Sequence, residues 1–247
     1  MKATAFEFRF RVAIITVVIT LGFFAPWTEA LGIGRRVSLL EWLGLELSRL
    51  GLLSFTVATP VVIVSSALIA AIGAVLRVWG TAYLGSFTVQ YGQMQAGAVM
   101  ADGPYRHLRN PLYLGSWCMV AAITFLMPPS GALFVLVVLA VFLLRLILGE
   151  EAFLTGQMGE PYQAYLRAIP RLVPRLRTTL QPTGRKPRWL PAVLAEISPI
   201  GVFITLAVFS WSYNNRLMIQ AILVSLGISL VVRALLPGIR EASSLSE

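Results

Sequence analysis

Six apolar runs dominate this sequence and limit the folds open to it, because each approaches the length that crosses a lipid bilayer. They cover residues 12–27, 52–79, 112–127, 132–148, 197–213 and 217–236. A membrane-spanning helix needs about 20 such residues. The two central runs are shorter, and a Pro-Pro-Ser-Gly turn at 128–131 joins them into a predicted helical hairpin. We therefore expect an all-α, polytopic membrane bundle of about six transmembrane helices.

Composition supports the same class of protein. Of 247 residues, 57% are hydrophobic and only 13% are charged, and the mean hydropathy is +0.78. Soluble domains carry roughly 25% charged residues. The polar side chains of this sequence are too few to cover a water-facing surface. Lipid must therefore surround much of the chain.

The charge distribution predicts which end of the bundle faces the cytoplasm. The net charge is +9, but the basic residues lie at the ends of apolar runs, where an anionic lipid leaflet rather than nucleic acid attracts them. If the N-terminus is cytoplasmic, the external segments hold only a few basic residues, namely Arg35, Arg36, Arg49 and Arg216. Both termini and the polar segments 80–110 and 149–195 are then cytoplasmic.

Three regions follow from this pattern. Residues 1–79 hold two transmembrane helices and, at 28–50, an amphipathic interfacial helix. The basic start resembles a signal peptide, but the membrane sequence that follows favours a retained first helix over cleavage. Residues 80–175 contain two polar segments around the hairpin, and residues 176–247 add a basic linker and two further helices.

The two polar segments, 80–111 and 149–175, are expected to meet, because the hairpin returns the chain to the side from which it left. Arg109, Asn110 and Tyr113 would then face Glu150 and Glu151. A purely structural alternative is also open. Asn can cap a helix whose first residue is Pro, and two adjacent acids can simply be solvated at a helix end.

The two segments together carry a recognisable pattern. It reads Gly-Pro-Tyr-Arg-x-x-Arg-Asn-Pro-x-Tyr-x-Gly from Gly103 to Gly115, then the Glu pair, then Gly-Glu-x-Tyr-x-x-Tyr-x-x-x-x-Pro from Gly159 to Pro170. Over residues 83–175 this resembles the isoprenylcysteine carboxyl methyltransferase family and the related phospholipid N-methyltransferases. Neither the first two nor the last two helices contribute to the resemblance.

The resemblance implies transfer of a methyl group from S-adenosyl-L-methionine to a lipid-like or prenylated acceptor, either a small molecule or a peptide, by carboxyl O- or amine N-methylation at the cytoplasmic membrane face. The implied cofactor-binding residues are Gln90, Gly97, Ala98, Val99, Met100, Tyr105, Arg109, Asn110, Pro111, Leu112, Tyr113, Glu150 and Glu151. The implied catalytic residues are Arg145, Glu150 and Asn110.

These residue types suit methyl transfer, an in-line displacement in which the enzyme mainly positions the reactants and excludes water. The cofactor's amino group calls for an acid and its carboxylate for Arg or N–H donors. A metal site is not expected, because the chain has one cysteine, Cys118, and one histidine, His107. Many carboxyl methyltransferases have His-Pro where this chain has Asn110-Pro111. Since Asn cannot accept a proton at neutral pH, the acceptor stays open.

Two other classes of protein fit parts of the pattern. Membrane sterol reductases of similar architecture bind NADPH and also carry Arg-x-x-Arg-His-Pro, but the Glu150-Glu151 pair would repel the phosphates of that cofactor. A transporter or membrane scaffold is the non-enzymatic alternative. Transporters commonly show two similar halves with interrupted helices, and the sequence has no internal repeat.

Overall fold

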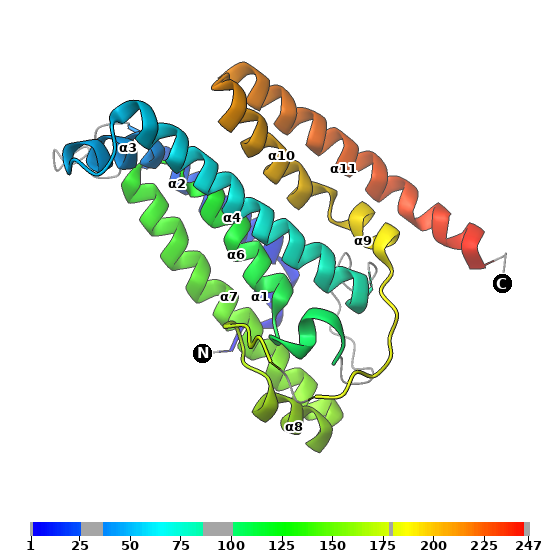
Figure 1. Cartoon of the computed structure of the whole chain (residues 1–247). Coiled ribbons are helices and arrows are strands. Elements are labelled where there is room, and N and C mark those ends of the chain that lie inside the picture. Colours follow the sequence, from blue (N-terminus) through cyan, green and yellow to red (C-terminus); the bar gives the residue numbers. More distant parts are fainter. Residues whose placement is uncertain (1, 26–36, 86–100, 178–179, 245–247) are drawn as a thin grey trace.

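The computed structural model describes residues 2–25, 37–85, 101–177 and 180–244, and every regular element in these ranges is helical, which confirms the predicted all-α class (Figure 1). The elements are α1 (Ala5–Arg9), α2 (Arg11–Phe24), α3 (Leu39–Arg49), α4 (Phe55–Leu84), η2 (Gly103–Arg106), α6 (Pro111–Thr124), α7 (Pro129–Met158), α8 (Glu160–Ala168), α9 (Trp189–Ala195), α10 (Ile197–Ser212) and α11 (Asn215–Ser244).

Fewer helices than predicted have the full length and apolarity of a membrane span. In the described ranges, α4 and α7 qualify with 30 residues each, and α9 with α10, bent by 68°, form a third candidate. Three apolar helices are shorter, at Arg11–Phe24, Pro111–Thr124 and Arg216–Val232. The apolar runs were therefore located correctly, but two to three rather than six of them meet the length of a complete span.

The central hairpin differs most from its prediction. Its second helix, α7, starts at Pro129 and continues to Met158, so that both glutamates lie inside a helix that extends ten residues beyond the apolar run predicted to end at 148. Hydropathy marks where a helix leaves the hydrocarbon, not where its hydrogen bonding stops. Here the helix ends only at Gly159, whose φ of 63° suits a residue without a side chain.

Interfacial helix α3 forms within the predicted amphipathic segment. Ser38 and Glu41 close a capping box at its N-terminus, and the backbone N–H groups of Leu39 and Leu40 donate to carbonyls of the hairpin turn at Met127 and Phe125. The interfacial helix is thereby fixed to the turn between α6 and α7.

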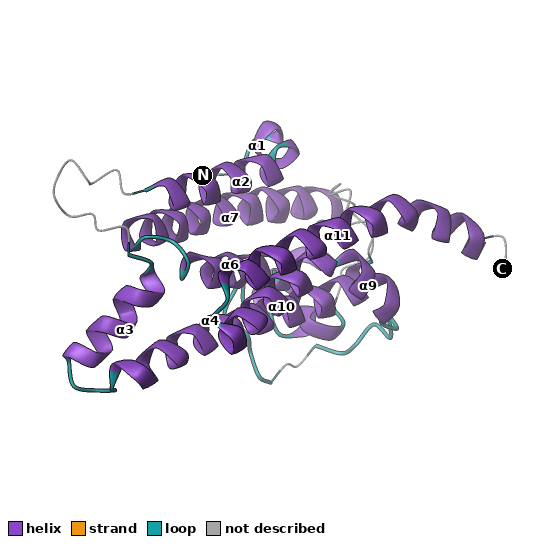
Figure 2. Cartoon of the chain, turned by 90° about the horizontal axis from the view of Figure 1, so that it is seen from above, coloured by secondary structure: helices purple, strands orange, loops and turns teal. Residues whose placement is uncertain are grey.

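Small residues let the long helices approach closely. A Cβ at Gly73 of α4 would lie 2.8 Å from the carbonyl oxygen of Gly115 of α6, and Gly22 of α2 meets Gly131 of α7 in a similar way. One apolar cluster joins α2 and α7 to one side of α6. A second cluster joins α4 and α10 to its other side. Seen from above, α6 lies between these two groups (Figure 2).

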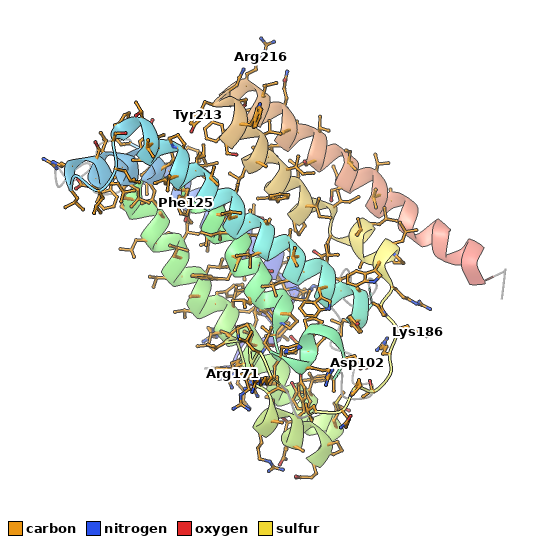
Figure 3. All side chains as sticks on the ribbon, viewed as in Figure 1. Asp102, Phe125, Arg171, Lys186, Tyr213 and Arg216 are labelled. Carbon is orange, nitrogen blue, oxygen red and sulfur yellow. The ribbon has the colours of Figure 1, made fainter. Side chains whose placement is uncertain are left out.

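Polar chain segments gather at one end of the bundle, where α4 and α7 end and α2 begins (Figure 1). We call this the site end; it comprises residues 2–11, 101–110, 159–177 and 180–188. Asp102, Arg171 and Lys186 lie there, whereas Tyr213 and Arg216 mark the opposite end (Figure 3).

Candidate functional site

The predicted meeting of the two polar segments is confirmed by hydrogen bonds between them. The backbone N–H of Arg109 donates to the carbonyl of Pro170 at 2.9 Å, and that of Arg175 donates to the carbonyl of His107 at 2.9 Å. The hydroxyl of Tyr165 on α8 donates to the carbonyl of Tyr105 at 2.8 Å. These bonds hold the turn that follows η2 against the chain that follows α7.

The first polar segment begins at a sharp turn. Gly103 has a φ of 55°, and a Cβ there would lie 2.3 Å from the ring of Tyr83, so that glycine alone fits. Asp102, which sequence reasoning missed, accepts hydrogen bonds from the backbone N–H groups of Thr183 and Arg185 and from the Thr183 hydroxyl. Burial raises the pKa of Asp102, but these hydrogen bonds outweigh it, so the pKa lies below its ordinary value.

Glu151 is the centre of a buried charged group at the site end. The guanidinium of Arg171 donates to both of its carboxylate oxygens, with Nη2 at 2.8 Å from Oε2. Arg109 Nη1 lies 3.5 Å from Oε1, and the Asn110 amide donates to the same oxygen at 3.4 Å. We call Glu151, Arg109, Asn110 and Arg171 the Glu151 cluster. The structural alternative of a solvated acid is therefore wrong for Glu151, which is 6% exposed.

Glu150 faces a different neighbour. Its Oε2 accepts a hydrogen bond from the hydroxyl of Tyr113 on α6 at 2.9 Å. Successive helical residues point about 100° apart, so the two acids contact different segments. Glu150 contacts the start of α6, and Glu151 contacts the segment around Arg109.

Two buried polar atoms beside these acids have no hydrogen-bond partner among the described residues, namely the hydroxyl of Tyr105 and Nε of Arg109. Burial raises the pKa of Tyr105 well above its ordinary value, so the phenol keeps its proton and remains a donor. A buried polar group without a partner costs about 1–3 kcal/mol. Such atoms are rare in folded proteins, and a bound ligand is one explanation for them.

The structural alternative for Asn110 is half right. Pro111 does occupy the first helical position of α6, with Asn110 as its N-cap residue. The Asn110 side chain, however, makes no capping hydrogen bond; it donates to Glu151 and, at 3.2 Å, to the carbonyl of Arg171. Its amide thus joins the two polar segments.

Arg145 lies apart from the Glu151 cluster. Its guanidinium makes two hydrogen bonds of 2.9 Å each to the carboxylate of Glu7, and its carbonyl accepts from the N–H of Ala3. The N-terminal segment therefore covers α7 at the predicted catalytic arginine. Glu7 was not predicted; an acid among the basic residues of the N-terminus was its only signal.

The other predicted site residues divide into two sets. Leu112 packs as an apolar contact of α4, where a Cβ at Gly80 would lie 2.9 Å from its side chain. Outside the described residues lie Gln90, Gly97, Ala98, Val99 and Met100.

A second buried ion pair escaped prediction. The guanidinium of Arg77 binds Glu196 with Nε at 2.6 Å from Oε2 and Nη2 at 3.0 Å from Oε1. Thr81 also donates to Glu196, and Arg77 Nη1 donates to Ser116. Glu196 is fully buried. An arginine inside an apolar run was the available signal, because such a charge requires a partner.

One of the comparisons with known proteins gives a match. Among the described residues, no group of three or more His, Cys, Asp or Glu side chains is placed to hold a metal ion. No curated protein and no solved structure gives a significant match. Residues 42–160 match the family model described as phospholipid methyltransferase, which implies a membrane methyltransferase that acts on lipid substrates. The matched segment runs from α3 to the start of α8 and includes both acids and the whole Gly103 to Tyr113 stretch. Residues 42–160 of this chain are thus similar to the phospholipid methyltransferase family, within the wider group of membrane methyltransferases that the sequence motifs resemble.

Proposed function

We propose that this protein transfers the methyl group of S-adenosyl-L-methionine to the amine of a phospholipid head group at the cytoplasmic membrane face. The observation that carries this proposal is the pair of unpartnered buried atoms, Tyr105 Oη and Arg109 Nε, beside two acids in a phospholipid methyltransferase segment. The carboxylate of a small ligand would accept hydrogen bonds from these two donors, and an ammonium group on the same ligand would pair with one of the acids.

The residues of the site end fit S-adenosyl-L-methionine. Tyr105 and Arg109 supply donors for its carboxylate, and Glu150 or Glu151 supplies an acceptor for its amino group. When bound, this cofactor would supply the methyl group of a sulfonium. The acceptor attacks the methyl carbon and S-adenosylhomocysteine leaves as a thioether, without help from a metal. The protein's own task is then to hold both reactants in line and keep water out.

Asn110 and Glu150 would have different roles toward the acceptor. Asn110 donates to Glu151 and to the carbonyl of Arg171, so its amide holds the cluster rather than taking a proton. An ammonium must lose a proton before it can attack as an amine. Glu150, half-buried and bonded to Tyr113, is the carboxylate we assign to accept that proton. Arg145, if Glu7 moves away, offers a fork of donors for the phosphate of the same lipid.

The basic residues of the site end support a cytoplasmic orientation. Arg109, Arg171, Arg175 and Lys186 lie there, and Arg216 lies at the other end (Figure 3). Basic residues accumulate on the cytoplasmic side of membrane proteins. We therefore place the methyl-transfer site at the cytoplasmic leaflet.

Ligand binding separates this proposal from the reductase alternative. In detergent-purified protein, S-adenosylhomocysteine should raise the melting temperature, while NADPH should leave it unchanged. Stabilisation by NADPH alone would contradict the methyltransferase assignment, and binding of neither ligand by a folded, monodisperse protein would favour a transporter or scaffold.

The acceptor is identified by product analysis. Methyl-labelled S-adenosyl-L-methionine is incubated with the protein in vesicles of phosphatidylethanolamine, and mass spectrometry detects the methylated lipid. A parallel reaction with a prenylated cysteine tests the carboxyl acceptor. Label in the prenylated cysteine and not in the lipid would overturn the amine assignment while preserving the cofactor.

A further inference from the structure

An apolar hollow lies between α4 and the helices α9 and α10, which follow the basic linker. It has a volume of about 580 Å³ and is walled by apolar side chains, among them Ala71, Val75 and Val78 of α4, Trp189 of α9, and Ile200 and Phe203 of α10. Small-molecule sites range from about 300 to 1,000 Å³. We call this hollow the α4–α10 groove.

The groove is separate from the methyl-transfer site, because it lies on a different face of α4. Gly73, Arg77 and Gly80, spaced three to four residues apart, face α6 and its contacts. Ala71, Val75 and Val78 have the same spacing on another face. The body of α4 therefore stands between the groove and Pro111, where α6 begins.

The buried ion pair gives the groove its shape. Glu196 lies between α9 and α10, at the point where the two helices bend by 68°. Arg77 and Thr81 of α4 donate hydrogen bonds to its carboxylate. A buried ion pair adds little net free energy to folding, but losing one partner is costly, so it fixes the position of the groups that carry it. Here it fixes α9 at an angle to α10, with Trp189 lining the groove.

Basic residues precede Trp189, which lines the groove. Lys186 and Arg188 are exposed and stand directly before Trp189, which is 51% exposed. The backbone N–H of Arg188 donates to the carbonyl of Ala82 at 2.8 Å, so the basic segment is tied to the end of α4. Figure 3 shows Lys186 at the site end, next to the start of α9. Trp beside Lys and Arg is the composition of a membrane–water interface.

We propose that the α4–α10 groove binds an acyl chain of an anionic membrane phospholipid, whose phosphate group pairs with Lys186 and Arg188. The apolar walls select a hydrocarbon chain, and the two cations at the mouth select negative charge. This lipid is bound outside the methyl-transfer site. The helices that form one wall lie beyond residues 42–160, so the site belongs to the part of the chain that the family match does not cover.

The test compares two lipids with the same acyl chains. Delipidated full-length protein is titrated with phosphatidylglycerol or phosphatidylcholine, and native mass spectrometry counts the bound molecules. We expect one phosphatidylglycerol to bind at least about tenfold more tightly than phosphatidylcholine, and the preference to weaken at high salt. Equal affinities for the two lipids, or occupation of the groove by a second copy of the chain, would overturn the proposal.

Variants separate the head-group contact from the chain contact. Lys186→Gln with Arg188→Gln should lower phosphatidylglycerol affinity about tenfold and leave phosphatidylcholine affinity unchanged. The matched control is Arg49→Gln with Arg216→Gln, the same charge change on exposed residues outside the site end, which should change neither affinity. If the control and the test variant lose affinity equally, bulk membrane charge and not a site explains the preference.

Val75→Trp tests the acyl-chain contact. Val75 is 62% exposed at the groove, so a large side chain fits there without disturbing the core, but it occupies the hollow. It should lower the affinity for both lipids. Val64→Trp, at an exposed position of α4 away from the groove, is the control. Unchanged lipid binding in Val75→Trp would place the lipid elsewhere on the protein.

Discussion

Two buried carboxylates, Glu196 and Glu151, are each paired with arginine, but only one pair is complete. Glu196 accepts from Arg77 and Thr81, and the remaining Arg77 group donates to Ser116. Every one of these interactions ends on another protein atom. Around Glu151, by contrast, Nε of the neighbouring Arg109 has no described partner. A completed pair holds helices together, whereas donors left over in a buried cluster indicate a ligand.

Exposure separates the two clusters as well. The Glu196 and Arg77 side chains are 1% and 20% exposed, so neither can turn toward water without moving a helix. Arg171, the main partner of Glu151, is 38% exposed and can release its carboxylate to solvent or to a ligand. The first pair is built to stay closed and the second is able to exchange partners.

Breaking the completed pair should have the largest effect on stability. Glu196→Gln keeps the side-chain shape but leaves the Arg77 guanidinium buried without a counter-charge. We expect the free energy of unfolding to fall by about 3–5 kcal/mol, measured by denaturant unfolding in detergent. Glu46→Gln, which breaks an exposed pair with Arg49, is the control and should cost about 1 kcal/mol or less. A similar small loss for Glu196→Gln would mean that its cluster is not the structural one.

Breaking the incomplete cluster should affect binding more than folding. Glu151→Gln removes the negative charge that Arg171 and Arg109 pair with, and we expect S-adenosylhomocysteine affinity to fall about 10- to 100-fold by calorimetry. Its stability loss should be smaller than that of Glu196→Gln, because Arg171 can turn to water. Glu160→Gln on the exposed surface of α8 is the control. Unchanged affinity in Glu151→Gln would remove the cluster from the cofactor site.

The same contrast explains what the sequence could predict. Three members of the Glu151 cluster, Arg109, Asn110 and Glu151, were found because they stand in two motifs on either side of one hairpin, so chain topology alone brings them together. Arg77 and Glu196 are 119 positions apart. No motif joins them, and only the packing of α9 and α10 against α4 does so. Arg171 was missed within a predicted segment because a charge near a helix end normally faces solvent.

The ends of the helices could be predicted only where the apolar run and the hydrogen-bonded helix end at nearly the same residue. The two agree for α10, where the apolar run ends in a turn. They differ for α7, which continues through Glu150 and Glu151 until Gly159 ends it. Short amphipathic helices such as α8 carry too few residues for their periodicity to stand out.

Removing the unpartnered hydroxyl of Tyr105 should weaken ligand binding without a loss of stability. Tyr105→Phe deletes a buried group that bonds to nothing among the described residues, so stability should stay the same or rise slightly. S-adenosylhomocysteine affinity should nevertheless fall about fivefold to tenfold, the value of one hydrogen bond. Tyr165→Phe, whose hydroxyl does have a partner, should instead lose about 0.5–1.5 kcal/mol of stability. Equal affinity of Tyr105→Phe and wild-type protein would mean that the hydroxyl does not contact the cofactor.

The smallest expected effect concerns Glu7, whose pair with Arg145 is partly open to solvent. The hydrogen bond from Arg145, with those from Thr4, lowers the pKa of Glu7 from 4.5 to about 2. A lowered pKa means that the folded state holds the ionised form more strongly than the unfolded state does. The resulting stability is present above about pH 4.5 and is lost as pH falls toward 2. Wild-type protein should therefore melt slightly above Glu7→Gln at pH 7, and the two melting curves should converge toward pH 2. A constant difference across this range would show that Glu7 stabilises the N-terminal segment by packing, and that Arg145 is not held by charge.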